Sequence, residues 1–266
     1  MTDRIEWTRH PDGVVELQLT RADKMNALDP AMFDALIEAG EKLMHDTGVR
    51  AVVISGRGKA FCAGLDMQSF EGMGDGVGAD LLTRTHGIAN APQQVAYIWR
   101  QVPVPVIAAV HGVAFGGGLQ VALGADVRIV APDAKMSVME IKWGLVPDMA
   151  GMVLMRELAR TDIVRELTFT GRIFSGEEAL RIGFATRVAA DPLAEALQLA
   201  HEIAAKSPSA IRAGKRLLNA SLAHSAAELL LAESVEQQAL IGSPHQREAV
   251  TANLGRRPPQ FTDPAA

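Results

Sequence analysis

Two glycine-bearing segments, each directly after a short apolar stretch, constrain the fold of this chain more than any other feature. AVVISG (51–56) is followed by KAFCAGLDM (59–67), and VPVIAAV (104–110) is followed by HGVAFGGGLQVALGAD (111–126). Apolar runs of this length, bounded by glycine or proline, are typical of buried strands. A triple glycine between such a strand and an apolar helical stretch exposes backbone N–H groups at a helix start, where they attract negative charge. Taken alone, the glycines are equally compatible with close packing of helix on sheet.

The remaining pattern predicts an α/β core. Strands are expected at 14–19, 51–55, 104–110, 127–130 and 135–138. Asp29 and Pro30 predict the N-cap and first residue of a helix that ends near His45. The alternation of strands and helices is typical of a βαβ-type core, which we assign to residues 1–195.

The second half of the chain is rich in helix signals. Capping boxes begin at Ser175, Ser225 and Ser243, and Asp191-Pro192 predicts another helix start. Helices are therefore expected at about 208–219, 226–241 and 244–253. Because residues 196–266 are too few to bury a core of their own, we expect them to pack on the main domain or on neighbouring subunits.

Composition excludes several classes of protein. The net charge of −5 and the lack of a basic stretch argue against nucleic-acid binding. No window approaches the length of apolar sequence that spans a membrane, and the N-terminal residues lack the apolar core of a signal peptide, so a cytoplasmic protein is expected. The seven histidines are scattered, which predicts no metal site, and Cys62 is the single cysteine, which excludes an internal disulfide. The sequence G-x-x-x-x-G-K-[ST] and the sequence G-x-G-x-x-G are both absent, which excludes P-loop and Rossmann nucleotide sites.

Together the two glycine segments resemble the crotonase, or enoyl-CoA hydratase/isomerase, superfamily. They match its patterns A-F-x-A-G-x-D and G-x-A-x-G-G-G, and LTRADKMNAL (19–28) is similar to its R-P-x-x-x-N-A-L segment, which wraps coenzyme A. Residues 167–188, 204–218 and 248–261 resemble its later segments, so the likeness spans nearly the whole chain. The resemblance implies a spiral of ββα turns with a C-terminal helical trimerisation region, assembled as a homotrimer or a dimer of trimers.

The resemblance also implies a substrate and a binding site. The substrate would be an acyl-CoA thioester, and no cofactor would be needed, since coenzyme A is part of the substrate. The backbone N–H groups of Leu65 and Gly117 would form an oxyanion hole around the thioester oxygen. Asp66 belongs to the matched segment, although an Asp at this point more often caps or orients a turn. The residues expected around the substrate and its coenzyme A are Lys24, Ala27, Ala63, Gly64, Asp66, Met67 and Gly118.

Three polar residues are the candidates for moving protons. Hydratases of the superfamily hold a water between two glutamates, and the corresponding positions here are Gln120 and Glu140. Glutamine can orient a water but cannot take its proton, which should handicap water addition. Asp148 follows Glu140 by eight residues, as in the dienoyl-CoA isomerases, where a Glu and an Asp act on opposite sides of the substrate. Those isomerases carry an Asp where Gln120 stands, so the match is incomplete.

Three functions follow from these residues. The leading hypothesis is an isomerase that moves a C=C bond in an unsaturated acyl-CoA, with Glu140 and Asp148 as proton carriers. A hydratase that uses Glu140, with Gln120 holding the water, is the second. A weakly catalytic protein that binds a CoA ligand is the third. Met67, Phe70, Trp143 and Leu145 are candidates for the acyl pocket, the glycine-rich stretch 71–80 predicts a surface loop, and Cys62 and His111 are expected to be structural.

Overall fold

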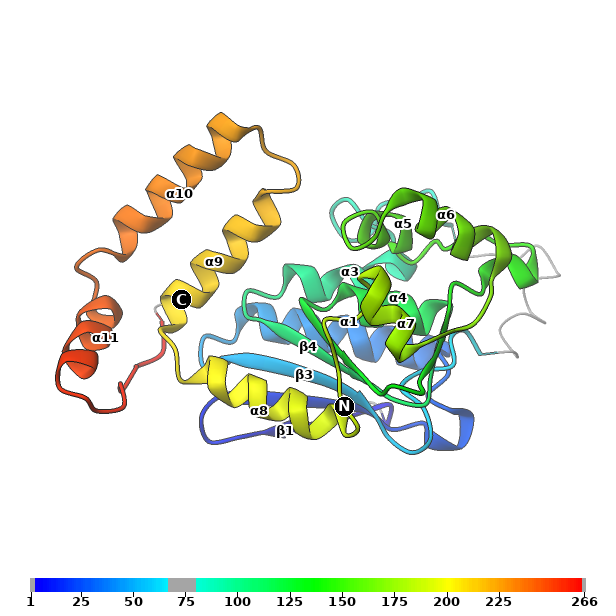
Figure 1. The fold of residues 1–266 in the computed structure, drawn as a ribbon, viewed down its shortest axis with the longest axis horizontal. Helices are drawn as coiled ribbons and strands as arrows, with labels where there is room; N and C mark the ends of the chain where they lie inside the picture. The colour runs from blue at the N-terminus through cyan, green and yellow to red at the C-terminus, as the bar shows by residue number, and fades with distance from the viewer. Residues whose placement is uncertain (1–2, 67–79, 265–266) are drawn as a thin grey trace.

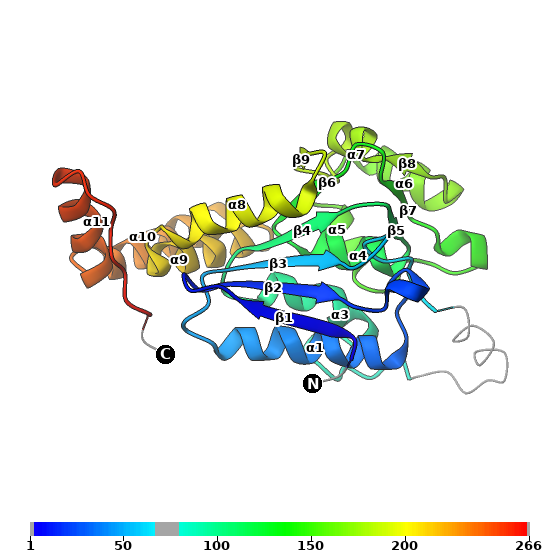
Figure 2. The same cartoon turned by 90° about the horizontal axis from the view of Figure 1, so that it is seen from below.

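A six-stranded sheet runs through the centre of the molecule in the order β1-β2-β3-β4-β6-β9 (Figure 2). The computed structural model describes residues 3–66 and 80–264. The first two strands pair antiparallel and all other neighbours in this sheet pair parallel. The strands are β1 (Ile5–Arg9), β2 (Val14–Leu19), β3 (Ala51–Gly56), β4 (Val106–Val110), β6 (Val127–Val130) and β9 (Arg187–Val188). Met67, Phe70 and most of the predicted loop 71–80 lie outside the described residues.

A second, three-stranded sheet lies beside the first. It contains β5 (Val113–Phe115), β7 (Lys135–Ser137) and β8 (Phe174–Ser175) in that order. Successive stretches of chain give one strand to each sheet: β4 is followed by β5 and then helix α4 (Gly117–Gly124), and β6 is followed by β7. This repetition carries each chain segment from the central sheet to the same edge, where the glycine-bearing turns lie.

Helices cover both faces of the central sheet. On one face lie α1 (Pro30–His45), α3 (Ala91–Gln101) and α4, and on the other lies α8 (Pro192–Ala204) (Figures 1 and 2). Successive residues of β3 alternate between the two cores: Val52 and Ile54 join the α1–α3 side, while Ala51 and Val53 join the α8 side. A strand buried on both faces reads as an unbroken apolar run, which explains why AVVISG has no polar alternation.

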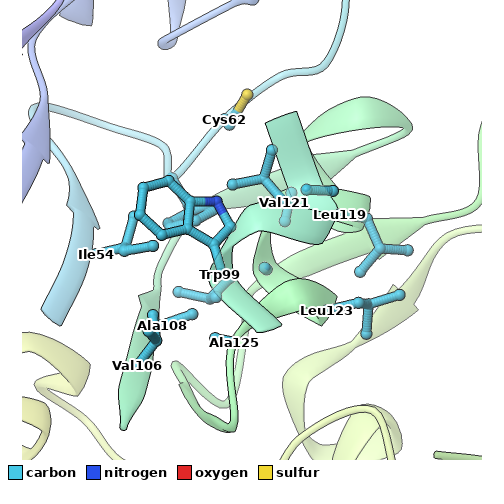
Figure 3. Close-up of a cluster of buried hydrophobic side chains, with 14 of the residues drawn as sticks. Ile54, Cys62, Trp99, Val106, Ala108, Leu119, Val121, Leu123 and Ala125 are labelled. Atoms are coloured by element: carbon cyan, nitrogen blue, oxygen red, sulfur yellow. The ribbon is translucent and has the colours of Figure 1, made fainter. Parts of the chain in front are cut away.

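Trp99 occupies the middle of the larger core. Its side chain is fully buried, and it lies among residues of β3, β4 and α4 that include Ile54, Ala108, Leu119 and Val121 (Figure 3). Trp99 belongs to α3, a helix that was not expected from the sequence. The signal was present: Asn90 and Gln93 form a reciprocal capping box at its start.

Most predicted elements are confirmed. Asp29 caps α1 by accepting a hydrogen bond from the Met32 N–H at 2.9 Å, and Ser225 and Glu228 form the expected capping box. The sequence patterns missed β1, α3 and the short strands β5, β8 and β9, as well as α5 (Gly151–Met155) and α6 (Thr161–Thr170). Strands of two or three residues are too short for a visible period, so only tertiary pairing defines them. Among the described helices, none is long and apolar enough to cross a membrane.

The C-terminal helices divide into an anchored part and a projecting part. The boundary predicted at residue 195 falls inside α8, which packs on the sheet. Helix α9 (Pro208–Ala220) is fixed to the core by Lys215, whose buried ammonium donates to the carbonyls of Trp99 and Val104 and to Asp126 at 2.7–3.0 Å. Helices α10 (Ala226–Leu240) and α11 (Pro244–Leu254) form an arm that projects from the core (Figure 1), and α10 has no buried residue.

The close contact between α3 and α4 yields a stability prediction. A Cβ placed on Gly124 would overlap the Ala96 carbonyl of α3, whereas one placed on Gly214 of α9 would meet no described atom within 4 Å. We expect Gly124→Ala to lower the free energy of unfolding by about 1–3 kcal/mol through overpacking. Gly214→Ala, the matched control, should raise it by up to ~1 kcal/mol because alanine favours the helix. Urea unfolding at one protein concentration measures both, and equal effects would contradict the packing argument.

Candidate active site

The two glycine-bearing segments lie side by side. Cys62 donates its N–H to the Val113 carbonyl at 3.0 Å and accepts from the Phe115 N–H at 3.1 Å, which is parallel strand pairing. Gly64 continues this contact with φ at +90°, and a Cβ there would stand 2.6 Å from the Phe115 carbonyl oxygen and 3.7 Å from the Gly117 nitrogen. Only glycine fits this position, because both the backbone conformation and the close approach exclude a side chain.

This pairing leaves two backbone N–H groups unused at neighbouring points. Within the described part of the chain, neither the Leu65 nor the Gly117 N–H donates a hydrogen bond, whereas the adjacent Asp66 and Gly116 N–H groups are bonded to Leu28 and Ser137. Gly117 is also the first residue of α4, whose dipole adds to the attraction for negative charge. The arrangement suits an oxyanion hole, and that role remains a prediction.

The 19–28 segment pairs with the first glycine segment from the other side. Leu28 donates to the Gly64 carbonyl at 2.8 Å and accepts from Asp66, and Ala63 donates to the Met25 carbonyl at 2.9 Å. Ala27 therefore lies beside Ala63 and Gly64, on the segment that pairs with theirs. Lys24 is exposed at the end of the short 3₁₀ helix η1 (Ala22–Lys24), and its expected contact with coenzyme A remains a prediction.

Asp66 is buried in an ion pair with Arg21. Arg21 also donates to the Ala27 carbonyl at 3.1 Å, so it ties the two segments together. This contact supports the orienting role considered for Asp66. Arg21 was not singled out from the sequence, although it is the arginine of the R-P-x-x-x-N-A-L match.

Asn26 is a second residue of the site that was not predicted from the sequence. It is fully buried with φ at +56°, and its amide nitrogen donates to the Arg57 and Ala60 carbonyls at 3.0 and 2.8 Å. Asn26 thereby fixes the turn that leads into the first glycine segment. Its own carbonyl accepts from the Cys62 thiol at 3.1 Å. Burial raises the pKa of Cys62 to about 12, so the thiol stays protonated at neutral pH, as a packed core residue should.

The carboxyl of Glu140 lies beside the second glycine turn. It stands at the start of the 3₁₀ helix η2 (Glu140–Trp143), and its Oε1 would be 3.2 Å from a Cβ on Gly116, the residue before Gly117. Oε1 accepts from Gln120 Nε2 at 2.6 Å, while Oε2 is buried and has no partner among the described residues. Burial raises the pKa of Glu140, and the nearby charge of Asp148 raises it further.

Gln120 connects Glu140 to the segment that contains Asp148. Its side-chain oxygen accepts from the Met149 and Gly151 N–H groups at 2.9 and 2.8 Å. Asp148 is exposed on one side, and the protein atoms that crowd its other side raise its pKa. The structure therefore brings together the three polar residues that the sequence nominated. Their catalytic roles remain predictions.

The other nominated residues lie around this centre. Gly118 is buried in α4, where a Cβ would overlap Cys62, so the structure gives it a packing function. The His111 ring is 2.9 Å from the Gly58 carbonyl oxygen, which fits the structural role expected for it. Trp143 and Leu145, the candidates for an acyl pocket, are 41% and 43% exposed. No cluster of metal-binding side chains occurs in residues 3–66 and 80–264.

Gly64 provides a direct test of the proposed anion site. Gly64→Ala should lower kcat on an acyl-CoA substrate by about 100-fold or more, because the added Cβ displaces the Leu65 N–H from its place beside Gly117. Gly87→Ala is the matched control, since Gly87 has a similar positive φ of 65° but no described atom within 4 Å of its Cβ position. Steady-state kinetics of both variants measures the difference. An active Gly64→Ala enzyme would contradict the site.

Comparison with known proteins agrees with this geometry. The chain matches the sequence profile of the Enoyl-CoA hydratase/isomerase family over residues 9–264. It is similar to the mitochondrial Delta(3,5)-Delta(2,4)-dienoyl-CoA isomerase of Homo sapiens, with 37% identity over 226 residues that cover 82% of this chain and 69% of that protein. It is also similar to a probable enoyl-CoA hydratase of Bacillus subtilis (strain 168), with 32% identity over 239 residues that cover 89% of this chain and 90% of that protein.

Solved structures confirm the fold. An enoyl-CoA hydratase of Mycobacterium smegmatis superposes with a TM-score of 0.83 at 30% identity, covering 98% of this chain and 99% of that one. A putative enoyl-CoA hydratase/isomerase of Mycobacterium abscessus gives a TM-score of 0.89 at 28% identity, with 98% and 100% covered. The predicted crotonase-like arrangement is thus confirmed. The chain belongs to the enoyl-CoA hydratase/isomerase family of acyl-CoA enzymes.

Proposed function

We propose that this enzyme moves a C=C bond within an unsaturated acyl-CoA thioester, with Glu140 and Asp148 as its proton carriers. The observation that carries this proposal is the presence and the hydrogen bonding of an amide side chain, that of Gln120, where a hydratase has a carboxylate. A hydratase of this family places a second glutamate there, and here the residue is an amide bonded to Glu140 and to two backbone N–H groups. Two carboxyls therefore remain at the site, and double-bond migration needs two proton carriers.

Migration begins with loss of a proton from C2 of the acyl chain. The resulting negative charge moves to the thioester oxygen, which we expect to lie against the Leu65 and Gly117 N–H groups. A single preorganised donor of this kind stabilises a transition state by about 3–4 kcal/mol. Both N–H groups are unused within the described chain, so they are available without breaking an intrachain bond.

The similarity to the human dienoyl-CoA isomerase suggests a substrate with two double bonds. In a 3,5-dienoyl-CoA, one carboxylate takes the proton from C2, and a carboxylic acid gives a proton to C6. The double bonds then lie at positions 2 and 4, and no atom is gained or lost. One carrier must begin ionised and the other protonated. The raised pKa values of Glu140 and Asp148 support this, because a carboxyl with a raised pKa holds its proton closer to neutral pH.

Hydration of a 2-enoyl-CoA is the second candidate. Several relatives and structural neighbours are named enoyl-CoA hydratases, and Glu140 is the carboxylate that a hydratase would retain. With a single glutamate, the attacking water would lose one of the two carboxylates that hold and activate it, so we expect hydration to be slow. Lack of turnover on every unsaturated acyl-CoA tested would instead favour the third candidate, a protein that binds a CoA ligand with little catalysis.

Two substitutions divide the candidates. Glu140→Gln should lower turnover of every substrate by about 100- to 10,000-fold, as for loss of a general base. Asp148→Asn should cost about 100-fold or more in migration of a 3,5-dienoyl-CoA and far less in hydration of a 2-enoyl-CoA, because only migration needs a carrier at the remote carbon. The measurement is kcat on both substrates: migration is followed by the rise in absorbance as the 2,4-dienoyl thioester forms, and hydration by the loss of absorbance as the conjugated 2-enoyl thioester is consumed.

Asp133→Asn is the control for these variants, because Asp133 is an exposed aspartate in the turn between β6 and β7. It should leave both activities unchanged. Efficient hydration by the wild-type enzyme, together with a silent Asp148→Asn, would replace the isomerase with the hydratase.

We also propose that the enzyme assembles as a homotrimer or a dimer of trimers through its C-terminal arm. The arm exposes apolar side chains that a monomer would leave in water. They are Leu230, Leu231, Val235, Ile241, Val250 and Leu254, and Leu218 on α9 and Leu222 in the turn after α9 are exposed as well. Light scattering should give three or six times the mass of one chain, which is 28.4 kDa. Leu231→Glu should dissociate the assembly and Glu233→Gln should not, whereas a wild-type monomer at micromolar concentration would contradict the proposal.

Two further expectations accompany this function. We propose that catalysis needs no cofactor, because coenzyme A arrives as part of the substrate and general acid–base chemistry suffices. A cytoplasmic location stays a prediction. Assay of dialysed enzyme with and without added cofactors tests the first.

A further inference from the structure

The side chain of Gln120 uses its two ends for different tasks. It is 2% exposed, and its position on the buried helix α4 leaves it little freedom to turn. Two N–H donors, from Met149 and Gly151, fix the side-chain oxygen, so the amide nitrogen must point at Glu140 Oε1, 2.6 Å away. The hydrogen-bond network thus defines which end faces Glu140.

The two bonds to the side-chain oxygen hold a strained turn. They come from the residues on either side of Ala150, whose φ of +66° is unusual for a residue with a side chain. Gly151 approaches so closely that a Cβ there would stand 2.5 Å from Gln120 Oε1. This turn directly follows Asp148, so whatever holds the turn also determines where Asp148 stands relative to Glu140.

We propose that Gln120 is a positioning residue that locks the 148–151 segment against Glu140 and keeps that side of the site to a single carboxylate. The proposal rests on the proposed function in taking Glu140 as a proton carrier. It assigns to Gln120 a role other than holding a water. It also means that the hydrogen bonds of Gln120 disfavour water addition, in addition to the lack of a second glutamate.

The consequence for Gln120→Glu follows from the geometry. One oxygen of the new carboxyl would keep the two N–H bonds, and the other would face Glu140 Oε1 at a distance of about 2.6 Å. Two carboxylates so close cannot both ionise, so they would share one proton. Instead of restoring a hydratase pair, the substitution should therefore remove Glu140 from service as a base until the shared proton leaves at higher pH.

Among the described residues, few other charges surround Glu140 and compete with this effect. Helices α4 and α5 carry no ionisable side chain. On the other described elements around Glu140, the ionisable side chains are Asp148, Lys142 of η2 and, on α6, Asp162, Arg165 and Glu166. Of these, Asp148 acts on Glu140, Lys142 lies over the Trp143 ring, and Asp162 and Glu166 form ion pairs with arginines.

The experiment compares Gln120→Glu and Gln120→Met with Gln94→Glu. Gln94 is the matched control, because it is also buried and bonded through its amide nitrogen, to Gln101 on α3. For each variant we would measure kcat against pH on the substrate that the wild type converts best, hydration of a 2-enoyl-CoA, and hydrogen exchange of the Met149 and Gly151 amides.

Gln120→Glu should move the acidic limb of the kcat profile to higher pH by about one unit or more, with the two amides still protected and hydration not increased. Gln120→Met should raise exchange of both amides by about tenfold or more and lower kcat more than it changes KM, because the substrate-binding segments stay in place. Gln94→Glu should leave the profile and both amides unchanged.

A Gln120→Glu enzyme with faster hydration and an unmoved acidic limb would overturn the proposal and make Gln120 a water-binding residue. The same limb shift in Gln94→Glu would also overturn it, since the effect would then belong to any buried carboxyl. Because Gln120→Glu retains the bonds to the turn, it remains informative even if Gln120→Met fails to fold. If the wild type hydrates and does not isomerise, the proposed function fails, while the limb shift measured on hydration still tests Gln120.

Discussion

Parallel pairing between residues 61–64 and 113–117 is the contact on which the rest of the site depends. Strand pairing normally consumes backbone N–H groups, yet here it ends at two glycines, and the Leu65 and Gly117 N–H groups lie close together without a hydrogen-bond partner among the described residues. Gly64 permits the close approach to Phe115, and Asn26 and Arg21 hold the flanking turns. If these N–H groups bind an anion, as proposed, the site consists of backbone and cannot be tuned by changing its own side chains, so its accuracy would come from the pairing that supports it.

Gln120 plays a comparable part for the side-chain chemistry. It joins helix α4 to two neighbouring elements further along the chain, the η2 turn with Glu140 and the turn after Asp148. The partly buried Glu140, with one oxygen bonded and the other without a partner among the described residues, is costly to keep charged, and this cost raises its pKa. Folding free energy from the large aliphatic core around Trp99 stabilises this unfavourable arrangement.

The sequence predicted a good part of this molecule. The helix from Pro30 to His45, the buried strand from Ala51 and the helix from Gly117 to Gly124 were all expected, because their signals are local: caps, apolar runs and glycines. The strands β5, β8 and β9 were not, because residues so few have no period of their own and become strands only by pairing. Helix α3 begins with a capping box, which is a local signal, so its start could have been predicted from the sequence.

For the site, the sequence by itself determined the chemical types: two glycine turns that expose backbone N–H groups, two carboxyls and an amide. Only the tertiary structure decided what those groups do to one another. Gln120 reads as a weak substitute for a catalytic glutamate until its oxygen is seen bonded to Met149 and Gly151, residues about thirty positions away, at 2.9 and 2.8 Å. The pKa of Glu140 likewise depends on burial and on Asp148, and neither is a local property of the chain. Composition and spacing record which groups are present, whereas hydrogen bonds and desolvation exist only between parts that folding brings together.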